Sequence, residues 1–283
     1  GASAARPQPS LAGYADDVLA ICRAHDLRDV VFVGHSVSAM IGVLAAVKEP
    51  ARFSRLVLVA PSPRYINDGD YVGGFTRQDI DGLLDLLDSN YMAWSSMLGP
   101  TIMGNPDRPE LGEELTSSFC RTDPTIARHF ARVLFLSDNR ADLPRLRVPS
   151  LILQCSQDAI APDVVGAYVH RQIGGSQLVK LAATGHCPNL SAPAETIAAI
   201  REFTDWENYG GAPLLGLDRA VVVTQANSGR RAFLNAIRLG AKIDRLQVLQ
   251  AVAAGVAKLR GATGLAAQAD PPAAEPTPEE PAP

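Results

Sequence analysis

Ser36 lies in a short motif whose residue types suit nucleophilic catalysis. The segment Gly34-His35-Ser36-Val37-Ser38 follows an apolar run and precedes a helical pattern. A serine on a tight turn from strand to helix exposes its hydroxyl, provided that the residues two positions away on either side are small. The same turn places the Val37 amide at a helix start, where unpaired N–H groups favour a developing oxyanion. An ordinary strand-turn-helix connection would give the same string, so the motif needs partners elsewhere in the chain.

Asp158 and His186 are the candidate partners of this serine. A hydroxyl near neutral pH is a weak nucleophile, so it needs a base within hydrogen-bond reach and a carboxylate that orients the base. Asp158 follows the apolar run at 151–155, and His186 follows the run at 177–182. The carboxyl ends of parallel strands meet at one edge of a sheet, which would bring both residues to the serine. The sequence therefore predicts a nucleophile at Ser36, an acid at Asp158 and a base at His186.

Each of these residues also has a simpler interpretation when it is taken alone. Asp158 fits a loop acid or a helix cap, and His186 fits a structural histidine with its hydrogen bonds satisfied. The pair His186-Cys187 would suit a metal ion, but no second pair of ligand residues lies nearby in the sequence. Three other histidines fall on helical patterns, and His35 is expected to line the pocket. We therefore predict a site without a metal or other cofactor.

Apolar runs and helical patterns alternate along the first two thirds of the chain. The runs predict buried strands at 30–33, 56–60, 151–155 and 177–182. The helical patterns lie at 11–25, 38–47, 164–172 and 193–203. This alternation predicts an α/β fold with a partial parallel sheet and helices on both faces.

The long segment between the second and third predicted strands has a helical pattern of its own. It is far longer than an ordinary crossover between strands. Thr76 with Asp79 resembles a capping box, and Asp123 followed by Pro124 is typical of another helix start. We therefore predict a helical cap insertion at about 64–145.

The last third of the chain differs in composition from the rest. We predict an α/β domain at 10–203, a helical extension at 204–260 and a disordered tail rich in Ala, Pro and Glu at 261–283. Apolar residues recur at helical spacing from Ile243 to Leu259, next to several Arg and Lys residues. This stretch would pack onto exposed apolar surface or bind a partner, or it is an unrelated extension with a solvated basic face.

Composition excludes several classes of protein. The formal net charge of −4 argues against a nucleic-acid partner. The chain has no apolar run long enough to span a membrane, and its first ten residues lack the features of a secretory signal. Its four cysteines show no CxxC pairing and suit a reduced compartment. These observations predict a cytoplasmic protein without a membrane partner.

Several long strings resemble one branch of a known family. They are GHSVSAMIGVLAA, PSPRYINDGDYVGGF, FCRTDPTIARHFARVLFLSDNRADL, VPSLILQCSQDAIAP and GHCPNLSAPAETI. Over residues 10–203 the sequence resembles the RsbQ-like α/β-hydrolases, bacterial relatives of the plant karrikin and strigolactone receptors. The resemblance implies a Ser-His-Asp hydrolase in which a four-helix cap covers a mostly hydrophobic pocket for a small apolar molecule. It also implies a positive regulator of a stress sigma-factor pathway whose partner is a PAS-domain protein phosphatase.

Two departures from the family pattern affect what the resemblance implies. Ser38 stands where the family usually has glycine, and we expect a modest packing change there with no loss of the turn. Family members carry further strands and a glycine-rich oxyanion loop before the region that matches Ser10. The resemblance therefore predicts an N-terminally truncated sheet in which the donor that would accompany the Val37 amide is missing.

Three functions are compatible with these patterns. The first is a serine hydrolase that cleaves a small lipophilic ester-like substrate through an acyl-serine. The second is a ligand-sensing regulator of a phosphatase, and the third is an inactive fragment. The same triad serves the first two, so the sequence alone does not separate them.

Overall fold

The computed structural model describes residues 9–263, except 209, 216, 218 and 227. The chain divides into two compact units, Gly1–Thr204 and Asp205–Pro283, which are described separately below. Of the tail predicted at 261–283, the first three residues belong to a helix, and the rest lies outside the described residues.

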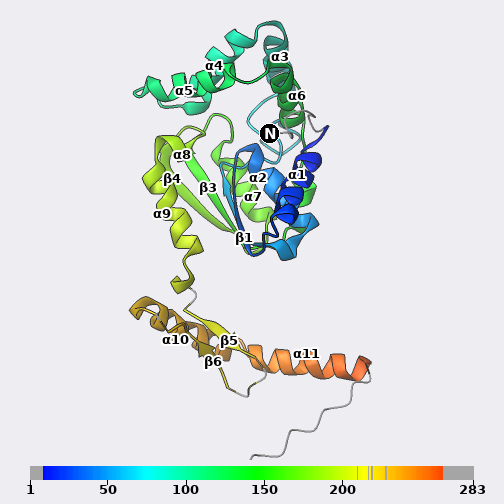
Figure 1. Ribbon diagram of the computed structural model, residues 1–283, viewed down its shortest axis with the longest axis vertical. Helices are drawn as coiled ribbons and strands as arrows, with labels where there is room; N and C mark the ends of the chain where they lie inside the picture. Colours follow the sequence, from blue (N-terminus) through cyan, green and yellow to red (C-terminus); the bar gives the residue numbers. More distant parts are fainter. Residues whose placement is uncertain (1–8, 209, 216, 218, 227, 264–283) are drawn as a thin grey trace, which may run out of the picture. The chain divides into compact units, whose positions relative to one another are not determined.

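Four parallel strands form the sheet of the first unit. They are β1 Val30–His35, β2 Phe53–Val59, β3 Ser150–Gln157 and β4 Gln177–Thr184. Their order in the sheet is β1-β2-β3-β4, and each neighbouring pair is parallel. The carboxyl ends of all four strands therefore lie at one edge of the sheet (Figure 1). The predicted α/β class with a parallel sheet is confirmed.

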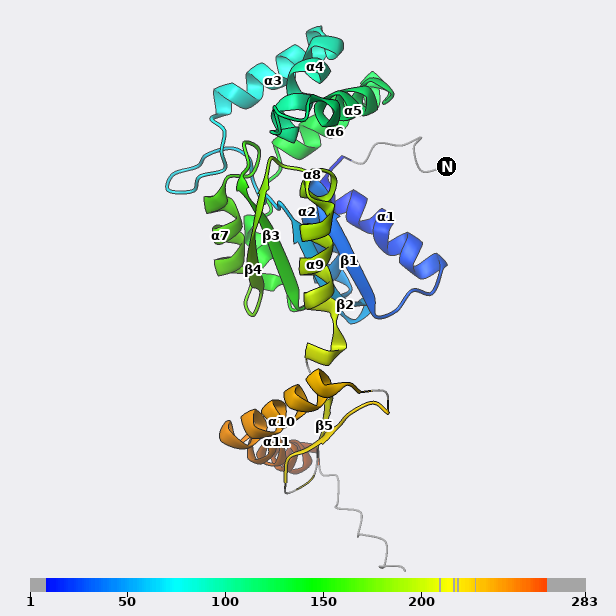
Figure 2. The same ribbon diagram turned by 90° about the vertical axis from the view of Figure 1, so that its left-hand side faces the viewer.

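Helices cover both faces of this sheet (Figure 2). They are α1 Leu11–Ala24, α2 Val37–Lys48 and α7 Asp163–Gln172 on one face, and α9 Pro193–Thr204 on the other. Side chains alternate along β2 because successive residues of a strand point to opposite faces. Leu56 and Leu58 belong to the core that includes α1 and α2, whereas Val57 and Val59 pack with Phe203 of α9.

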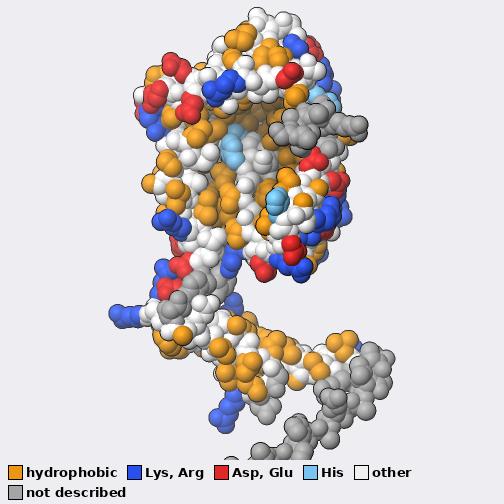
Figure 3. Space-filling view, in the orientation of Figure 1, with side chains coloured by type: hydrophobic (Ala, Val, Ile, Leu, Met, Phe, Trp, Pro, Cys, Tyr) orange, Lys and Arg blue, Asp and Glu red, His pale blue; other side chains and the backbone are white. Residues whose placement is uncertain are grey.

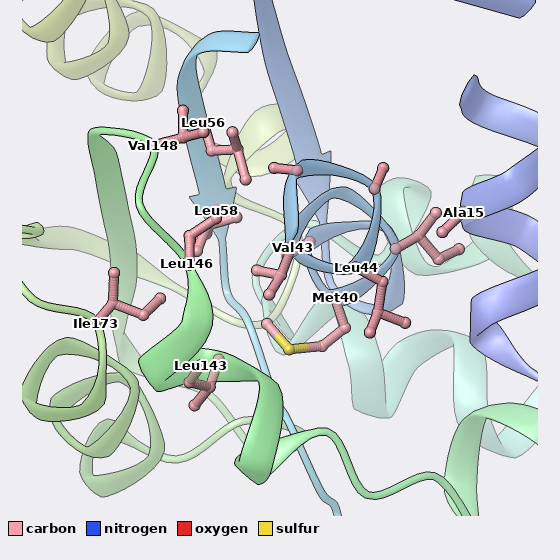
Figure 4. Close-up of a cluster of buried hydrophobic side chains, with 14 of the residues drawn as sticks. Ala15, Met40, Val43, Leu44, Leu56, Leu58, Leu143, Leu146, Val148 and Ile173 are labelled. Carbon is pink, nitrogen blue, oxygen red and sulfur yellow. The ribbon is translucent and has the colours of Figure 1, made fainter. Parts of the chain in front are cut away.

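The larger of these cores holds α2 firmly against the sheet. Met40 and Val43 of α2 pack in one buried cluster with Leu56 and Leu58 of β2, and Leu44 lies on the side of α2 nearer Ala15 (Figure 4). Full burial of one such aliphatic side chain contributes roughly 1.5–3 kcal/mol. The helix that follows Ser36 is therefore fixed along its length, and so is the turn that precedes it.

Four helices form the cap between β2 and β3. They are α3 Arg77–Ser89, α4 Tyr91–Met103, α5 Pro109–Cys120 and α6 Pro124–Phe135, and the short 3-10 helix η3 Arg140–Arg145 leads back to β3. The predicted capping box is present: the Asp79 amide donates to Thr76 Oγ1 (3.1 Å), and the Thr76 amide donates to Asp79 Oδ2 (2.7 Å). Asp123 caps α6 through the Thr125 amide (2.8 Å). The cap covers the edge where the strands end (Figures 1 and 2).

β1 lies at one end of the sheet. Within the described part of the chain it pairs with β2 alone. Val31 and Val33 are 41% and 51% exposed, whereas Val30 and Phe32 pack on the opposite face. The sheet therefore presents apolar side chains to solvent along β1.

The second unit contains a short hairpin and two helices. They are β5 Ala212–Leu214 and β6 Val221–Val223, which are antiparallel, α10 Arg230–Arg245 and α11 Val248–Thr263, preceded by the 3-10 helix η4 Trp206–Asn208. The apolar positions that recur at helical spacing from Ile243 to Leu259 are divided between α10 and α11. Gln247 has a φ of 52° and ends the first helix, so Ile243 is buried while Leu246 and Leu259 are exposed. None of the helices among the described residues has the length and apolar content needed to cross a membrane.

Candidate active site

Ser36 occupies a strained turn between β1 and α2. Its φ of 56° and ψ of −122° are unusual for a residue with a side chain. The Ser36 amide donates to the Val59 carbonyl (2.8 Å), which ties the turn to β2. A Cβ at Gly34 would lie 2.5 Å from the Ser38 carbonyl oxygen, so the turn has no room for a larger residue there. The tight strand-to-helix turn expected from the motif is therefore present, and serine at position 38 is accommodated.

The structure brings Ser36, His186 and Asp158 together as a hydrogen-bonded chain. His186 Nε2 lies 2.7 Å from Ser36 Oγ, and His186 Nδ1 lies 2.8 Å from Asp158 Oδ2. Because an ionised carboxylate only accepts, Nδ1 carries the proton and Nε2 is left to accept from the serine hydroxyl. The His186 and Asp158 side chains are 3% and 0% exposed, so bulk water does not compete for these bonds.

The Asp158 carboxylate is held by the backbone that follows β3. The amides of Ile160 and Ala161 donate to its Oδ1 at 2.8 and 2.9 Å. Its other oxygen accepts from His186, so three donors stabilise the charge. The loop-acid interpretation left open by the sequence describes how Asp158 is held, but it does not account for the bond to His186.

The His186 loop packs directly against the end of the cap. Gly185 has a φ of 79°, and a side chain there would overlap the Met103 carbonyl oxygen of α4. The His186 amide donates to the Ile102 carbonyl (2.8 Å), and Asn105 Nδ2 donates to the Thr184 carbonyl (3.1 Å). The cap therefore helps to position the histidine that contacts Ser36. The sequence showed the glycine but gave no signal for this contact.

His35 does not line the pocket as the sequence predicted. Its Nε2 donates to the backbone carbonyl of His186 (2.6 Å), and the two rings lie 5.0 Å apart. Burial, followed by the nearby His186, lowers the pKa of His35 to about 4, so His35 is neutral at pH 7. The prediction was wrong because His35, the last residue of β1, shares a strand face with Val31 and Val33 and is not among the residues that line the cavity.

Tyr65 is a residue at this site that the sequence did not single out. Its hydroxyl lies 3.4 Å from Ser36 Oγ, and its side chain is almost fully buried. Burial raises the pKa of Tyr65 to about 12, so the hydroxyl remains protonated at neutral pH. Tyr65 lies in an irregular segment six residues beyond the end of β2, and no local pattern connects it to the serine.

A cavity of about 370 Å³ lies above Ser36 and His186. Its walls come mainly from aromatic and aliphatic side chains of the cap, including Phe75, Tyr91, Trp94, Leu98, Ile102, Phe119, Phe130, Leu134 and Phe135. Away from Ser36 and His186, Ser118 and Thr122 supply hydroxyl groups. Figure 3 shows a hollow with largely hydrophobic walls between the cap and the sheet. The cavity suits a small apolar molecule whose reactive group meets Ser36.

A second, larger hollow lies elsewhere on the same unit. Its volume is about 760 Å³, and charged side chains such as Lys48, Arg132 and Asp142 are among its lining residues. It contains neither Ser36 nor His186. The reactive side chains therefore select the smaller cavity as the candidate site. No group of three or more His, Cys, Asp or Glu residues in the described ranges is arranged to hold a metal ion.

Comparison with known proteins agrees with this geometry. The model of the Alpha/beta hydrolase family matches residues 1–200. Karrikin insensitive 2 receptor CA of Petunia hybrida is 41% identical over 192 residues, 68% of this chain and 71% of that protein. Strigolactone esterase D14 of Arabidopsis thaliana is 37% identical over 189 residues, 66% of this chain and 70% of that protein.

Solved structures give the same result. A hydrolase from Oleispira antarctica is 40% identical and superposes with a TM-score of 0.68, covering 70% of this chain and 73% of its own. The predicted α/β-hydrolase fold is thereby confirmed. The family model matches more than half of the residues of this chain, and the chain therefore belongs to the alpha/beta hydrolase family.

Proposed function

We propose that the protein is a serine hydrolase that cleaves small lipophilic esters through an acyl-serine intermediate. Ser36 is the nucleophile, His186 the general base and Asp158 the acid that orients it. The observation that carries this proposal is the pair of hydrogen bonds, 2.7 and 2.8 Å long, that joins the three side chains beneath an apolar cavity. Relatives described as esterases support the same chemistry.

The reaction follows the ordinary course of acyl transfer. His186 Nε2 takes the Ser36 proton as Oγ attacks the ester carbonyl, and the π electrons move to the carbonyl oxygen. The Val37 amide, at the first position of α2, donates to that oxyanion. The C–O bond then breaks, and His186 returns the proton to the departing alcohol. Water repeats the sequence on the acyl-serine and releases the acid.

The shape and chemistry of the cavity set the expected substrate class. A volume of about 370 Å³ is near the lower end of ligand pockets. Its aromatic walls offer apolar contact on several sides, and they provide no charged side chain for an ionic group among the lining residues described. We therefore expect neutral esters or lactones with a compact apolar body.

Fluorophosphonate labelling tests this proposal directly. The wild-type protein should form one adduct, which peptide mapping assigns to Ser36, and Ser36→Ala should remove it. His186→Ala should slow labelling by about 1,000-fold or more, because the unassisted hydroxyl is a poor nucleophile. Ser38→Ala is the matched control, since Ser38 lies two residues away in the first turn of α2 and takes no part in the two bonds that join Ser36, His186 and Asp158, and it should label like the wild type. A protein that is folded by circular dichroism but gives no adduct contradicts the proposal.

A second candidate function is ligand sensing. Its support is the direct bonding of the cap end to the His186 loop, through the Ile102 carbonyl and Asn105, so that events at His186 reach the cap. Relatives described as karrikin receptors support a signalling role. In this case the partner is a PAS-domain phosphatase of the stress sigma-factor pathway, as the RsbQ-like resemblance suggests.

The regulator is tested with the phosphatase itself. Wild-type protein and a small apolar ester should together raise the activity of a PAS-domain phosphatase, and neither should do so alone. Ser36→Ala separates binding from turnover, because it can hold the ester without cleaving it. No change in phosphatase activity under any of these conditions contradicts the regulatory function and does not affect the proposed hydrolase function.

We place both functions in the cytoplasm, since Cys22, Cys120, Cys155 and Cys187 are free thiols.

A further inference from the structure

We propose that the Tyr65 hydroxyl is a further catalytic donor, which hydrogen-bonds to the leaving-group oxygen as the ester bond breaks. The inference rests on the proposed hydrolase function and deepens it. It predicts that the protein handles esters of poor leaving groups, such as unactivated alcohols, as well as activated aryl esters.

The position of the hydroxyl carries the argument. Tyr65 Oη and His186 Nε2 lie 3.4 and 2.7 Å from the same atom, Ser36 Oγ. A reacting carbonyl carbon approaches its nucleophile to about 3 Å before bond formation. The oxygens bonded to that carbon must therefore occupy the space that Tyr65 and His186 border, and the phenol is within donating distance of one of them.

The surroundings of Tyr65 indicate which oxygen it meets. The oxyanion belongs at the start of α2, where the Val37 amide is unpaired within the helix. Tyr65 instead follows β2, the strand between β1 and β3, and it belongs to the same buried cluster as Ile160, whose amide donates to Asp158. It is therefore on the side of the His186–Asp158 pair, where the departing oxygen recovers its proton.

The hydroxyl is held in place and remains a donor. The Tyr65 ring packs edge-on against Phe135, with centroids 5.5 Å apart, and its backbone carbonyl accepts from the Phe75 amide (3.1 Å). Burial keeps the phenol protonated, because its pKa is raised to about 12. The bond to Ser36 Oγ is at the long end of the hydrogen-bond range, so a substrate oxygen can replace it at little cost.

The chemical step balances without a new reactant. When the tetrahedral intermediate collapses, the oxyanion electrons re-form the carbonyl, and the electrons of the C–O bond pass to the leaving oxygen. His186 delivers the proton that it took from Ser36. Tyr65 keeps its own proton throughout and stabilises the negative charge that accumulates on the leaving oxygen before the proton arrives.

A series of esters with one acyl group and different leaving groups tests the inference. Nitrophenolate disperses its own charge, so Tyr65→Phe should lower kcat/KM for a nitrophenyl ester by only about 3-fold. An alkoxide holds its charge on one oxygen, so the loss for an ethyl or benzyl ester should reach about 100-fold, the size expected for one lost donor. The ratio kcat/KM is the right quantity, because it reports the steps up to and including acylation.

The controls separate this inference from the proposed function. Tyr168→Phe removes a phenol hydroxyl on α7, outside the cavity, and should leave every ester unchanged. Fluorophosphonate labelling of Tyr65→Phe should stay within about 3-fold of wild type, since fluoride departs without help from a donor. If the wild type labels at Ser36, but Tyr65→Phe loses the same factor in kcat/KM for every leaving group or loses nothing, the proposed role of Tyr65 is wrong. The hydrolase function is not affected by that result. If the folded wild type does not label, the hydrolase function fails and the inference fails with it.

Discussion

The contact between Gly185 and the cap yields the sharpest prediction about how this site is held. Gly185 has a φ of 79°, and an added Cβ would overlap the Met103 carbonyl oxygen. Gly185→Ala therefore has two costs: the left-handed backbone, about 1–2 kcal/mol, and the overpacking, typically 1–3 kcal/mol. We expect a loss of about 3 kcal/mol in the free energy of unfolding.

Gly175 is a matched control for the first of these costs. Its φ of 75° is nearly the same, but an added Cβ would meet nothing within 4 Å. Gly175→Ala should therefore lose only about 1–2 kcal/mol and keep its activity. The difference between the two variants, about 1–3 kcal/mol, measures the contact between the His186 loop and α4.

The activity of Gly185→Ala should fall further than its stability suggests. Relief of the overlap must move the adjacent His186 or the end of α4, and misplacement of a reacting group by about 1 Å can lower the rate by about 100-fold. The assays are urea unfolding for stability and hydrolysis of a nitrophenyl ester at a temperature where both variants are folded. If Gly185→Ala matches Gly175→Ala in both assays, the cap does not position His186.

Three further predictions concern other parts of the same account. Asp158→Asn should keep the fold but lower kcat/KM by about 1,000 to 10,000-fold, because an amide at this position no longer fixes the Nδ1–H tautomer of His186; equal activity would remove Asp158 from the mechanism. The pKa of His35 is lowered to about 4, so between this value and about 6.5 the unfolded chain binds a proton that the folded protein does not. Stability should therefore fall as the pH drops through this window, by up to about 3 kcal/mol, and His35→Gln should flatten the dependence in urea titrations at several pH values. Thr76→Ala should cost about 1 kcal/mol through loss of the α3 capping box and leave esterase activity unchanged, as thermal unfolding and a nitrophenyl ester assay would check.

The sequence was most informative where local patterns and sheet topology act together. The meeting of Ser36, Asp158 and His186 could be predicted because each follows an apolar run, and parallel strands bring their carboxyl ends to one edge. The capping residues Thr76 and Asp123 could also be predicted from the sequence, because the start of a helix depends on residues within about four positions.

The sequence was least informative where a residue's role depends on tertiary contacts. Tyr65 and Ser36 are 29 positions apart in the sequence, and Gly185 and the cap residue Met103 are more than 80 positions apart. No local sequence pattern predicts contacts between residues so far apart. His35 was misplaced because it ends β1, where the face of the strand and the contact with the His186 carbonyl, rather than proximity to Ser36 in the chain, fix its ring. The apolar spacing from 243 onward predicts helix but not where one helix ends and the next begins; the break falls at the left-handed residue Gln247.

Trapping of the acyl-enzyme tests the central claim most directly. The protein is mixed with a nitrophenyl ester of a short fatty acid, quenched in acid within the first turnovers, digested and analysed by mass spectrometry. The account predicts an acyl group on the peptide that contains Ser36, which decays as hydrolysis proceeds and is absent from Ser36→Ala. Ester hydrolysis by a folded protein whose acyl group is found on another residue, or that persists in Ser36→Ala, would contradict it.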